Sequence, residues 1–271
     1  MATTVAARPV GVTTGGKRRI IFPILAALLA LVGFILLDGV REGIAPWSMH
    51  VYYDAQPEIL RWHHLAHGAT VGVLLSCSML VLVWRPANKP LLLQMYIIGF
   101  LTLTAVYGTV DPMAIAGFLP AALVVSGILL AAHPDRQSVL RFSLPGASRV
   151  LLGLTILAAV AMAPAVIRAF THVYDEPAFE GAADPSRWGA DIIMSFTLII
   201  AGLLVSSKRG GWLPLGIIVG LDFLFIGAAA LTIPDQPGSW GTAGGVLSIL
   251  FGIVWLAAVW HERRQGVELA D

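Results

Sequence analysis

The chain has 271 residues, of which 57% are hydrophobic and 12% are charged, and its formal net charge is +1. A soluble domain carries about a quarter charged residues, so most of these side chains must face lipid or other apolar helices. The balanced charge gives no reason to expect nucleic acid as a partner, and the single cysteine, Cys77, excludes an intrachain disulfide.

Eight apolar segments are long enough to cross a bilayer, because about 20 helical residues span its hydrocarbon core. In chain order they cover residues 19–38, 62–84, 91–110, 113–132, 149–170, 188–206, 212–233 and 241–260. The sequence therefore predicts an all-α integral membrane protein with eight transmembrane helices. No small-residue cleavage site follows the first segment, so we interpret it as a retained helix and not as a signal peptide.

Basic residues alternate between the two sides of these segments. The N-terminal tail, the C-terminal tail and every second loop contain at least two Lys or Arg residues, whereas the two short loops on the other side contain none. Four arginines near the long loops of that other side are exceptions: Arg41, Arg61, Arg168 and Arg187. Since basic loops mark the cytoplasmic side, we predict that both termini are cytoplasmic (N-in/C-in), in a cytoplasmic membrane of bacterial type.

Short strings recur about 122 to 128 residues apart and in the same order. The string HVYYD at residues 50–54 returns as HVYD at 172–175, RW at 61–62 returns at 187–188, and HPDRQ at 133–137 returns as HERRQ at 261–265. Recurrence at a nearly fixed period indicates an internal repeat. We therefore predict two four-helix repeats, which are parallel because each contains an even number of helices.

The predicted organisation follows from these segments. A disordered cytoplasmic tail covers residues 1–18, the first repeat 19–137, a cytoplasmic linker 138–148, the second repeat 149–265 and a C-terminal tail 266–271. The lipid bilayer is the expected partner, with a second copy of the chain or a partner membrane subunit as further alternatives.

Histidines gather at the start of the second predicted helix. His63 and His67 are spaced i,i+4, and His64 and His67 i,i+3, so pairs of imidazoles share one helix face. Imidazoles at these spacings can bind zinc or copper, or ligate haem, and His50 and Asp54 upstream could complete a ligand set. The structural alternative is a polar latch between the helix and the preceding loop, present only in the first repeat.

The recurring HVYD string places His172 and Asp175 in the predicted outer loop of the second repeat. In a structural role, their side chains would hydrogen-bond to hold the loop against the membrane surface. In a functional role, the two copies of the string would form a symmetric pair of sites.

Asp222 lies near the middle of the seventh predicted helix, among apolar neighbours. A carboxylate at that depth costs about 2.5 kcal/mol or more, so we expect it to be protonated, hydrogen-bonded or next to a wet cavity. Hydroxyl groups on other predicted helices are candidate partners: Thr102, its approximate counterpart in the first repeat, Thr104, Tyr107, Ser195 and Thr197. A functional interpretation makes Asp222 a proton or cation site, and a structural one makes it an interhelical hydrogen bond.

The sequence contains no nucleotide-binding glycine motif, no metalloprotease motif and no nucleophile elbow, so it indicates no enzymatic reaction. Two functions are consistent with it. One is a small-solute or cation transporter whose pathway lies between the repeats, with Asp222 as its ionisable group. The alternative is a non-transporting membrane protein, such as an oxidoreductase subunit, that binds a divalent metal, haem or a partner protein at its outer histidines. We favour transport because duplication and intramembrane acids occur together in transporters.

Overall fold

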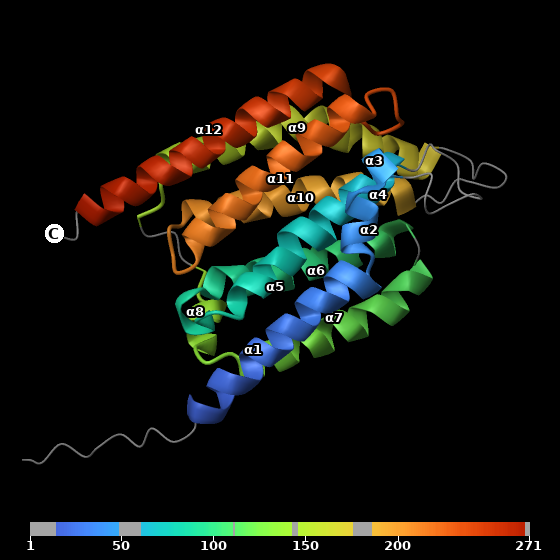
Figure 1. The fold of residues 1–271 in the computed structure, drawn as a ribbon. Coiled ribbons are helices and arrows are strands. Elements are labelled where there is room, and N and C mark those ends of the chain that lie inside the picture. The colour runs from blue at the N-terminus through green and yellow to red at the C-terminus, as the bar shows by residue number, and fades with distance from the viewer. Residues whose placement is uncertain (1–14, 49–60, 111, 143–145, 176–185, 269–271) are drawn as a thin grey trace, which may run out of the picture.

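The computed structural model describes residues 15–48, 61–110, 112–142, 146–175 and 186–268. Every regular element within these ranges is a helix, and the long helices lie side by side along a common direction (Figure 1). The all-α class is therefore confirmed for the described part of the chain.

The long helices follow the predicted segments closely. The first is α1 (Gly15–Leu31) with the π-helix η1 (Val32–Leu36), and the second is α4 (Arg61–His67), the π-helix η4 (Gly68–Ser76) and α5 (Cys77–Leu82). The others are α6 (Pro90–Val110), α7 (Pro112–Ala132), α9 (Arg149–Asp175), α10 (Ser186–Ser206), α11 (Trp212–Thr232) and α12 (Gly241–Glu268). Short elements connect them: α2 (Gly39–Gly43), α3 (Ala45–Ser48), η5 (Pro86–Asn88) and α8 (Arg136–Leu140).

Seven helices among the described residues are long and apolar enough to cross a membrane. The first predicted segment is shorter than these seven, because its apolar helix covers only Ile20–Leu36. The chain then turns at Asp38, whose φ of 55° is left-handed. A polytopic membrane protein is thus confirmed, with seven candidate spans in place of the eight predicted.

Three predicted boundaries differ from the observed helices. α8 begins before the predicted linker and continues into it, α9 extends five residues past position 170, and α12 runs to Glu268. Hydropathy locates only the part of a helix that lies in lipid, whereas a helix can continue into water because its backbone hydrogen bonds are internal. The predicted disordered tail over residues 1–18 is wrong for residues 15–18, which belong to α1, and residues 1–14 lie outside the described residues.

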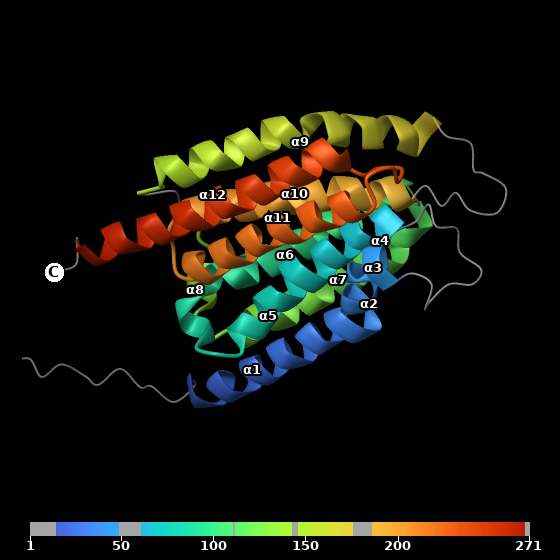
Figure 2. The ribbon, with the colours of Figure 1, turned by 45° about the horizontal axis from the view of Figure 1, so that its top comes forward.

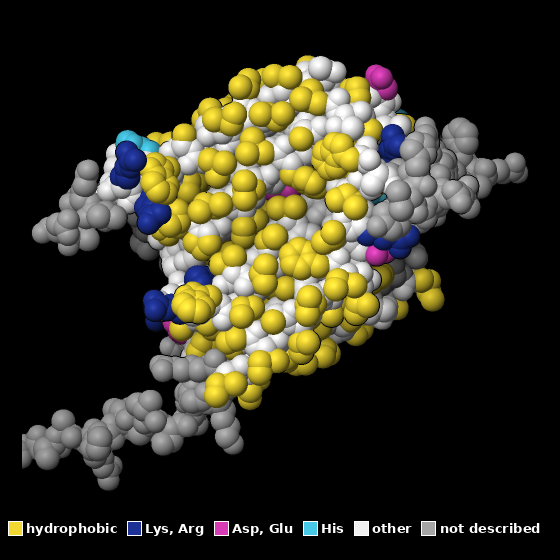
Figure 3. All heavy atoms as spheres, viewed as in Figure 1, with side chains coloured by type: hydrophobic (Ala, Val, Ile, Leu, Met, Phe, Trp, Pro, Cys, Tyr) yellow, Lys and Arg dark blue, Asp and Glu magenta, His cyan; other side chains and the backbone are white. Residues whose placement is uncertain are grey.

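Four inner helices separate two outer pairs. Figures 1 and 2 show α9 and α12 on one side of the inner helices and α1 and α7 on the other. The buried share is 72% for Arg61–Leu82 and Trp188–Ser206 and 61% for Pro90–Thr109 and Trp212–Thr232, but only 17% to 28% for the three long outer helices. Apolar side chains cover the face seen in Figure 3, with Lys and Arg near the two ends of the helices. This distribution fits outer helices that face lipid.

Small residues bring α2 directly against the second span. Gly39 of α2 lies on Gly72 and Gly43 lies on Gly68, and a Cβ added to Gly72 would be only 2.7 Å from the carbonyl oxygen of Gly39. Close backbone approach of this kind stabilises helix pairs in lipid, where the hydrophobic effect does not drive association.

The second span is a π-helix over the nine residues Gly68–Ser76, where it packs against α2 and α11. The hydroxyl of Ser76 donates to the carbonyl oxygen of Val71, five residues earlier, at 2.6 Å. π-helical turns are rare in proteins overall, and those that occur are often at functional sites. This segment is therefore a candidate location for a functional site.

The Gly39–Gly72 contact predicts a strong dependence on glycine. Gly72→Ala should lower the free energy of unfolding by roughly 1–3 kcal/mol, because its Cβ must displace the backbone of α2. Gly153→Ala on α9 is the matched control, since a Cβ there meets nothing within 4 Å and a helical Gly-to-Ala change alone is favourable by about 0.5–1 kcal/mol. Thermal unfolding of the detergent-purified variants checks both, and equal midpoints for the two would contradict the prediction.

Candidate functional site

Among the Asp, Glu, Lys and Arg side chains in the described part of the bundle, that of Asp222 is the most deeply buried. Its exposure is 0%, and neither carboxylate oxygen has a hydrogen-bond partner among the described residues. α11, which carries it, packs on η4 and α5 of the second span. Asp222 therefore lies on a helix at the contact between the two halves of the chain.

The hydroxyl groups predicted to bind Asp222 do not do so in this structure. Those of Thr104 and Thr197 donate within their own helices, to the carbonyl oxygens of Phe100 at 2.9 Å and Ile193 at 2.7 Å. Such bonds satisfy a hydroxyl locally. Thr102 and Ser195 also make no hydrogen bond to Asp222, so the acid has no hydrogen-bond partner in the part of the chain that the structure describes.

A second polar cluster forms where α2 crosses the second span, and we call Glu42, His64 and His67 the outer cluster. Glu42 Oε1 lies 3.3 Å from His64 Nδ1, and its Oε2 lies 3.7 Å from His67 Nε2. His67 Nε2 is also 3.1 Å from the carbonyl oxygen of Leu37. Because a carbonyl only accepts, Nε2 of His67 carries the proton. These contacts join α2 to the second span.

The charge state of Glu42 follows from its surroundings. Burial alone would raise the pKa of Glu42, but the contact with His64 and the charges of His67, His64 and His63 lower it. The imidazoles prevail, so the pKa lies below its usual value and the side chain is a carboxylate at neutral pH. α2 lies outside the apolar spans.

Metal ligation finds no further support in the outer cluster. Across the part of the chain that the structure describes, no group of three or more His, Cys, Asp or Glu side chains could hold a metal ion. His50 and Asp54, the predicted upstream ligands, lie outside the described residues. His63 lies beside His64, with ring centroids 5.5 Å apart, and does not join Glu42 in an ion pair.

Glu42 is the member of this cluster that the histidine pattern did not reveal. The signal in the sequence is positional: Glu42 follows the first apolar segment, and His64 begins the second. Consecutive antiparallel helices place such residues at the same end of the bundle, and the turn into α2 then brings the acid to the imidazoles.

The string at residues 172–175 lies in α9 and not in the predicted loop. The ring of His172 stacks on Trp188, with centroids 4.5 Å apart and planes 20° from parallel, and Trp188 is buried. The Asp175 side chain is not among those that the structure describes. His172 thus packs α9 against α10 through an aromatic contact.

Comparisons of the chain with protein-family models, curated proteins and solved structures give no match. A function for this chain therefore has to come from the chemistry of its own residues.

The outer cluster predicts an acid-sensitive stabilisation. Since the pKa of Glu42 is lowered on folding, its contribution is complete above the unfolded-state value of about 4.3 and is lost as the pH falls through the folded-state value. Glu42→Gln should lower the free energy of unfolding at pH 7 by about 1–3 kcal/mol, because the buried His64 and the partly buried His67 lose a charged acceptor. It should also remove that part of the pH dependence.

Circular dichroism melts between pH 3 and pH 8 measure both effects. Asp235→Asn is the matched control, since Asp235 is exposed on the α11–α12 loop and should leave the stability curve unchanged. A Glu42→Gln curve that coincides with the wild-type curve would remove the outer cluster from the stability of the fold.

Proposed function

We propose that the protein is a proton-coupled permease for a small solute or cation, in which Asp222 carries the proton between two parallel four-helix repeats. The observation behind it is the complete burial of Asp222 without a hydrogen-bond partner among the described residues. An intramembrane acid is costly and is retained where a proton or cation must bind. No described contact of Asp222 gives it a structural reason to be there.

Helix packing supports the repeat. In the first half, α1 packs on α5, α5 on α6, α6 on α7, and α7 returns to α1. In the second half, α9 packs on α10, α10 on α11, α11 on α12, and α12 returns to α9. The second and third spans of each half are also buried to the same extent, 72% and 61%. Two rings of the same order are what repeats about an axis along the membrane normal would form.

The proposed pathway lies between the inner helices. Contacts between the halves run from α10 to α6 and from α11 to η4 and α5, and Asp222 lies at the second of these. Transporters commonly bind their substrates at the repeat interface, near irregular helices. The nine-residue π-helix η4, next to Cys77 and Asp222, is consistent with such a position.

We assign the outer cluster to proton exchange with solvent. His67 and Cys77 lie on the same span, ten residues apart, which corresponds to about 15 Å along a helix. A proton cannot cross that distance in one hydrogen-bonded step, so water must enter the interface between the halves during transport. Glu42 and the two imidazoles would supply and accept protons at its outer end.

The metal- or haem-binding alternative is less well supported. Both partly buried imidazoles of the outer cluster already contact Glu42, and His67 also meets the carbonyl of Leu37. A ligand would have to displace these contacts.

Asp222→Asn should abolish coupled proton flux, because an amide cannot release a proton at neutral pH, and folding should be retained, since Asn has nearly the same size. Flux is measured in proteoliposomes loaded with a pH-sensitive dye, on addition of Na⁺, K⁺ or Mn²⁺ salts and then of small neutral and anionic solutes. The exposed Asp235→Asn variant is the matched control and should transport normally. Wild-type flux in Asp222→Asn liposomes would eliminate Asp222 as the proton carrier.

The proposed orientation can be tested with single cysteines. α1 begins and α12 ends at the same end of the bundle (Figure 1), and basic loops predict that this end is cytoplasmic. In a Cys77→Ser background, Asp235→Cys should react with a membrane-impermeant maleimide in intact cells. Arg264→Cys should react only after permeabilisation. The reverse pattern would invert the topology, and reaction of both in intact cells would rule out eight crossings.

A further inference from the structure

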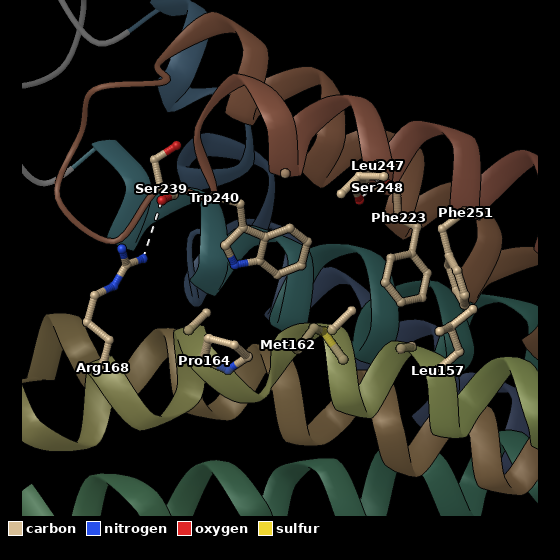
Figure 4. A pocket seen from close by; sticks show the side chains of 14 residues that line it. Leu157, Met162, Pro164, Arg168, Phe223, Ser239, Trp240, Leu247, Ser248 and Phe251 are labelled. Carbon is tan, nitrogen blue, oxygen red and sulfur yellow. Dashed lines mark hydrogen bonds between the residues drawn. The ribbon is translucent and has the colours of Figure 1, made fainter.

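A cavity of about 680 Å³ lies between α9, α11 and α12 (Figure 4). Its walls are apolar over most of their length and include Leu157, Met162, Phe223, Leu247 and Phe251. The volume falls within the range of about 300–1,000 Å³ that is typical of ligand pockets. One polar group along these walls, the hydroxyl of Ser248, donates to the carbonyl oxygen of Phe223 at 2.7 Å, so it is satisfied within the protein.

A single cation marks one end of this cavity. Arg168 Nη2 donates to the carbonyl oxygens of Gly238 at 3.1 Å and Ser239 at 3.3 Å, in the α11–α12 loop. Carbonyl groups carry no net charge, and Arg168 forms no ion pair with an Asp or Glu of the described ranges. The Trp240 side chain lies between Arg168 and the two phenylalanines (Figure 4). The cavity therefore has a charged end and an apolar end.

The cavity borders the lipid-facing side of the second half. α9 and α12 are outer helices with only 22% and 28% of their spans buried. α9 packs chiefly on α10, and α12 packs chiefly on α11. The two thus form the sides of a groove with α11 as its floor. A molecule can therefore enter the groove most directly from the bilayer.

The length of the groove matches one leaflet. From Leu157 to Arg168, α9 advances eleven residues, or about 16 Å. Half of the hydrocarbon core is about 15 Å thick. Arg168 and Trp240 therefore lie at headgroup depth when the apolar end lies near the bilayer centre, which is where Arg and Trp side chains are stable.

We propose that this groove binds one anionic phospholipid, with an acyl chain along Leu157, Met162 and Phe251 and the headgroup phosphate on Arg168. A guanidinium pairs with a phosphate through charge-assisted hydrogen bonds. It can do so here while Nη2 keeps its bonds to the loop, because a guanidinium has five N–H donors. This assignment does not rest on the proposed transport function.

The test uses the full chain, purified, delipidated and reconstituted with phosphatidylglycerol or phosphatidylcholine that carries a photoreactive diazirine on one acyl chain. Cross-links are mapped by mass spectrometry. We expect them on the groove faces of α9 and α12, with a higher yield for phosphatidylglycerol. Soluble glycerol phosphate should not compete, because the apolar walls contribute much of the binding.

Two matched pairs of variants separate the groove from the general lipid surface. Ala161→Trp fills the groove, whereas Val160→Trp adds the same ring next to it on a side chain that is 66% exposed. Only the first should abolish the cross-links. Arg168→Gln should weaken phosphatidylglycerol binding about tenfold and leave phosphatidylcholine unchanged, and Arg149→Gln at the other end of α9 should change neither.

Three cross-linking results would overturn the proposal. They are cross-links spread evenly over the outer helices, groove cross-links that persist in Ala161→Trp, and equal yields for the two lipids in the wild-type protein. A neutral isoprenoid bound in place of phospholipid, found in the organic extract of the purified protein, would also overturn it. Arg168→Gln keeps the apolar walls, so its headgroup readout decides the matter if Ala161→Trp does not fold.

Discussion

The backbone contact between α2 and the second span is the constraint from which the polar architecture of the first half follows. Because Gly39 lies directly on Gly72, the first helix must stop at Leu37 and turn. The turn leaves the Leu37 carbonyl without a helical partner, and His67 donates to it. The same turn carries Glu42 to the imidazoles. A helix that simply left the membrane at this point would place none of these groups together.

The partly buried Glu42 and the fully buried Asp222 lie in opposite electrostatic surroundings. Glu42 is desolvated, but the imidazoles more than offset that cost and its pKa falls. Asp222 is desolvated completely and has no hydrogen-bond partner among the described residues. No hydrogen bond from a described residue offsets the cost of burying the Asp222 carboxyl, a cost that an apolar side chain at this position would avoid. The contrast between the two acids is therefore what makes Asp222 the functional candidate.

Hydropathy was sufficient to predict the long helices, because each requirement for crossing lipid is local: about 20 apolar residues in a row. Contacts between helices join residues that are far apart in the sequence, so they were predicted less well than the helices themselves. Thr104 and Thr197 bond within their own helices, which no spacing rule distinguishes from bonding to Asp222. The repeated strings also differ in use. His133 ends a helix and receives a hydrogen bond from the Asp135 N–H, whereas α12 continues through the corresponding residues, and Glu262 there binds Lys208 at 2.7 Å.

Movement between the two halves of the chain would have to keep the contacts at the basic end of the bundle intact. There Arg209, just before α11, donates to Gln94 of α6 at 3.2 Å and to the carbonyl of Ser138, so the two halves are tied together. At the opposite end, Trp47 of α3 donates to the Thr232 hydroxyl at 2.9 Å, on an exposed surface where water competes. A neutral hydrogen bond on an exposed surface is worth less than a charge-assisted one that is partly buried. In the proposed transport cycle, the interface would therefore open toward Asp222 from the end that carries the outer cluster, and the Arg209 contacts would act as the hinge.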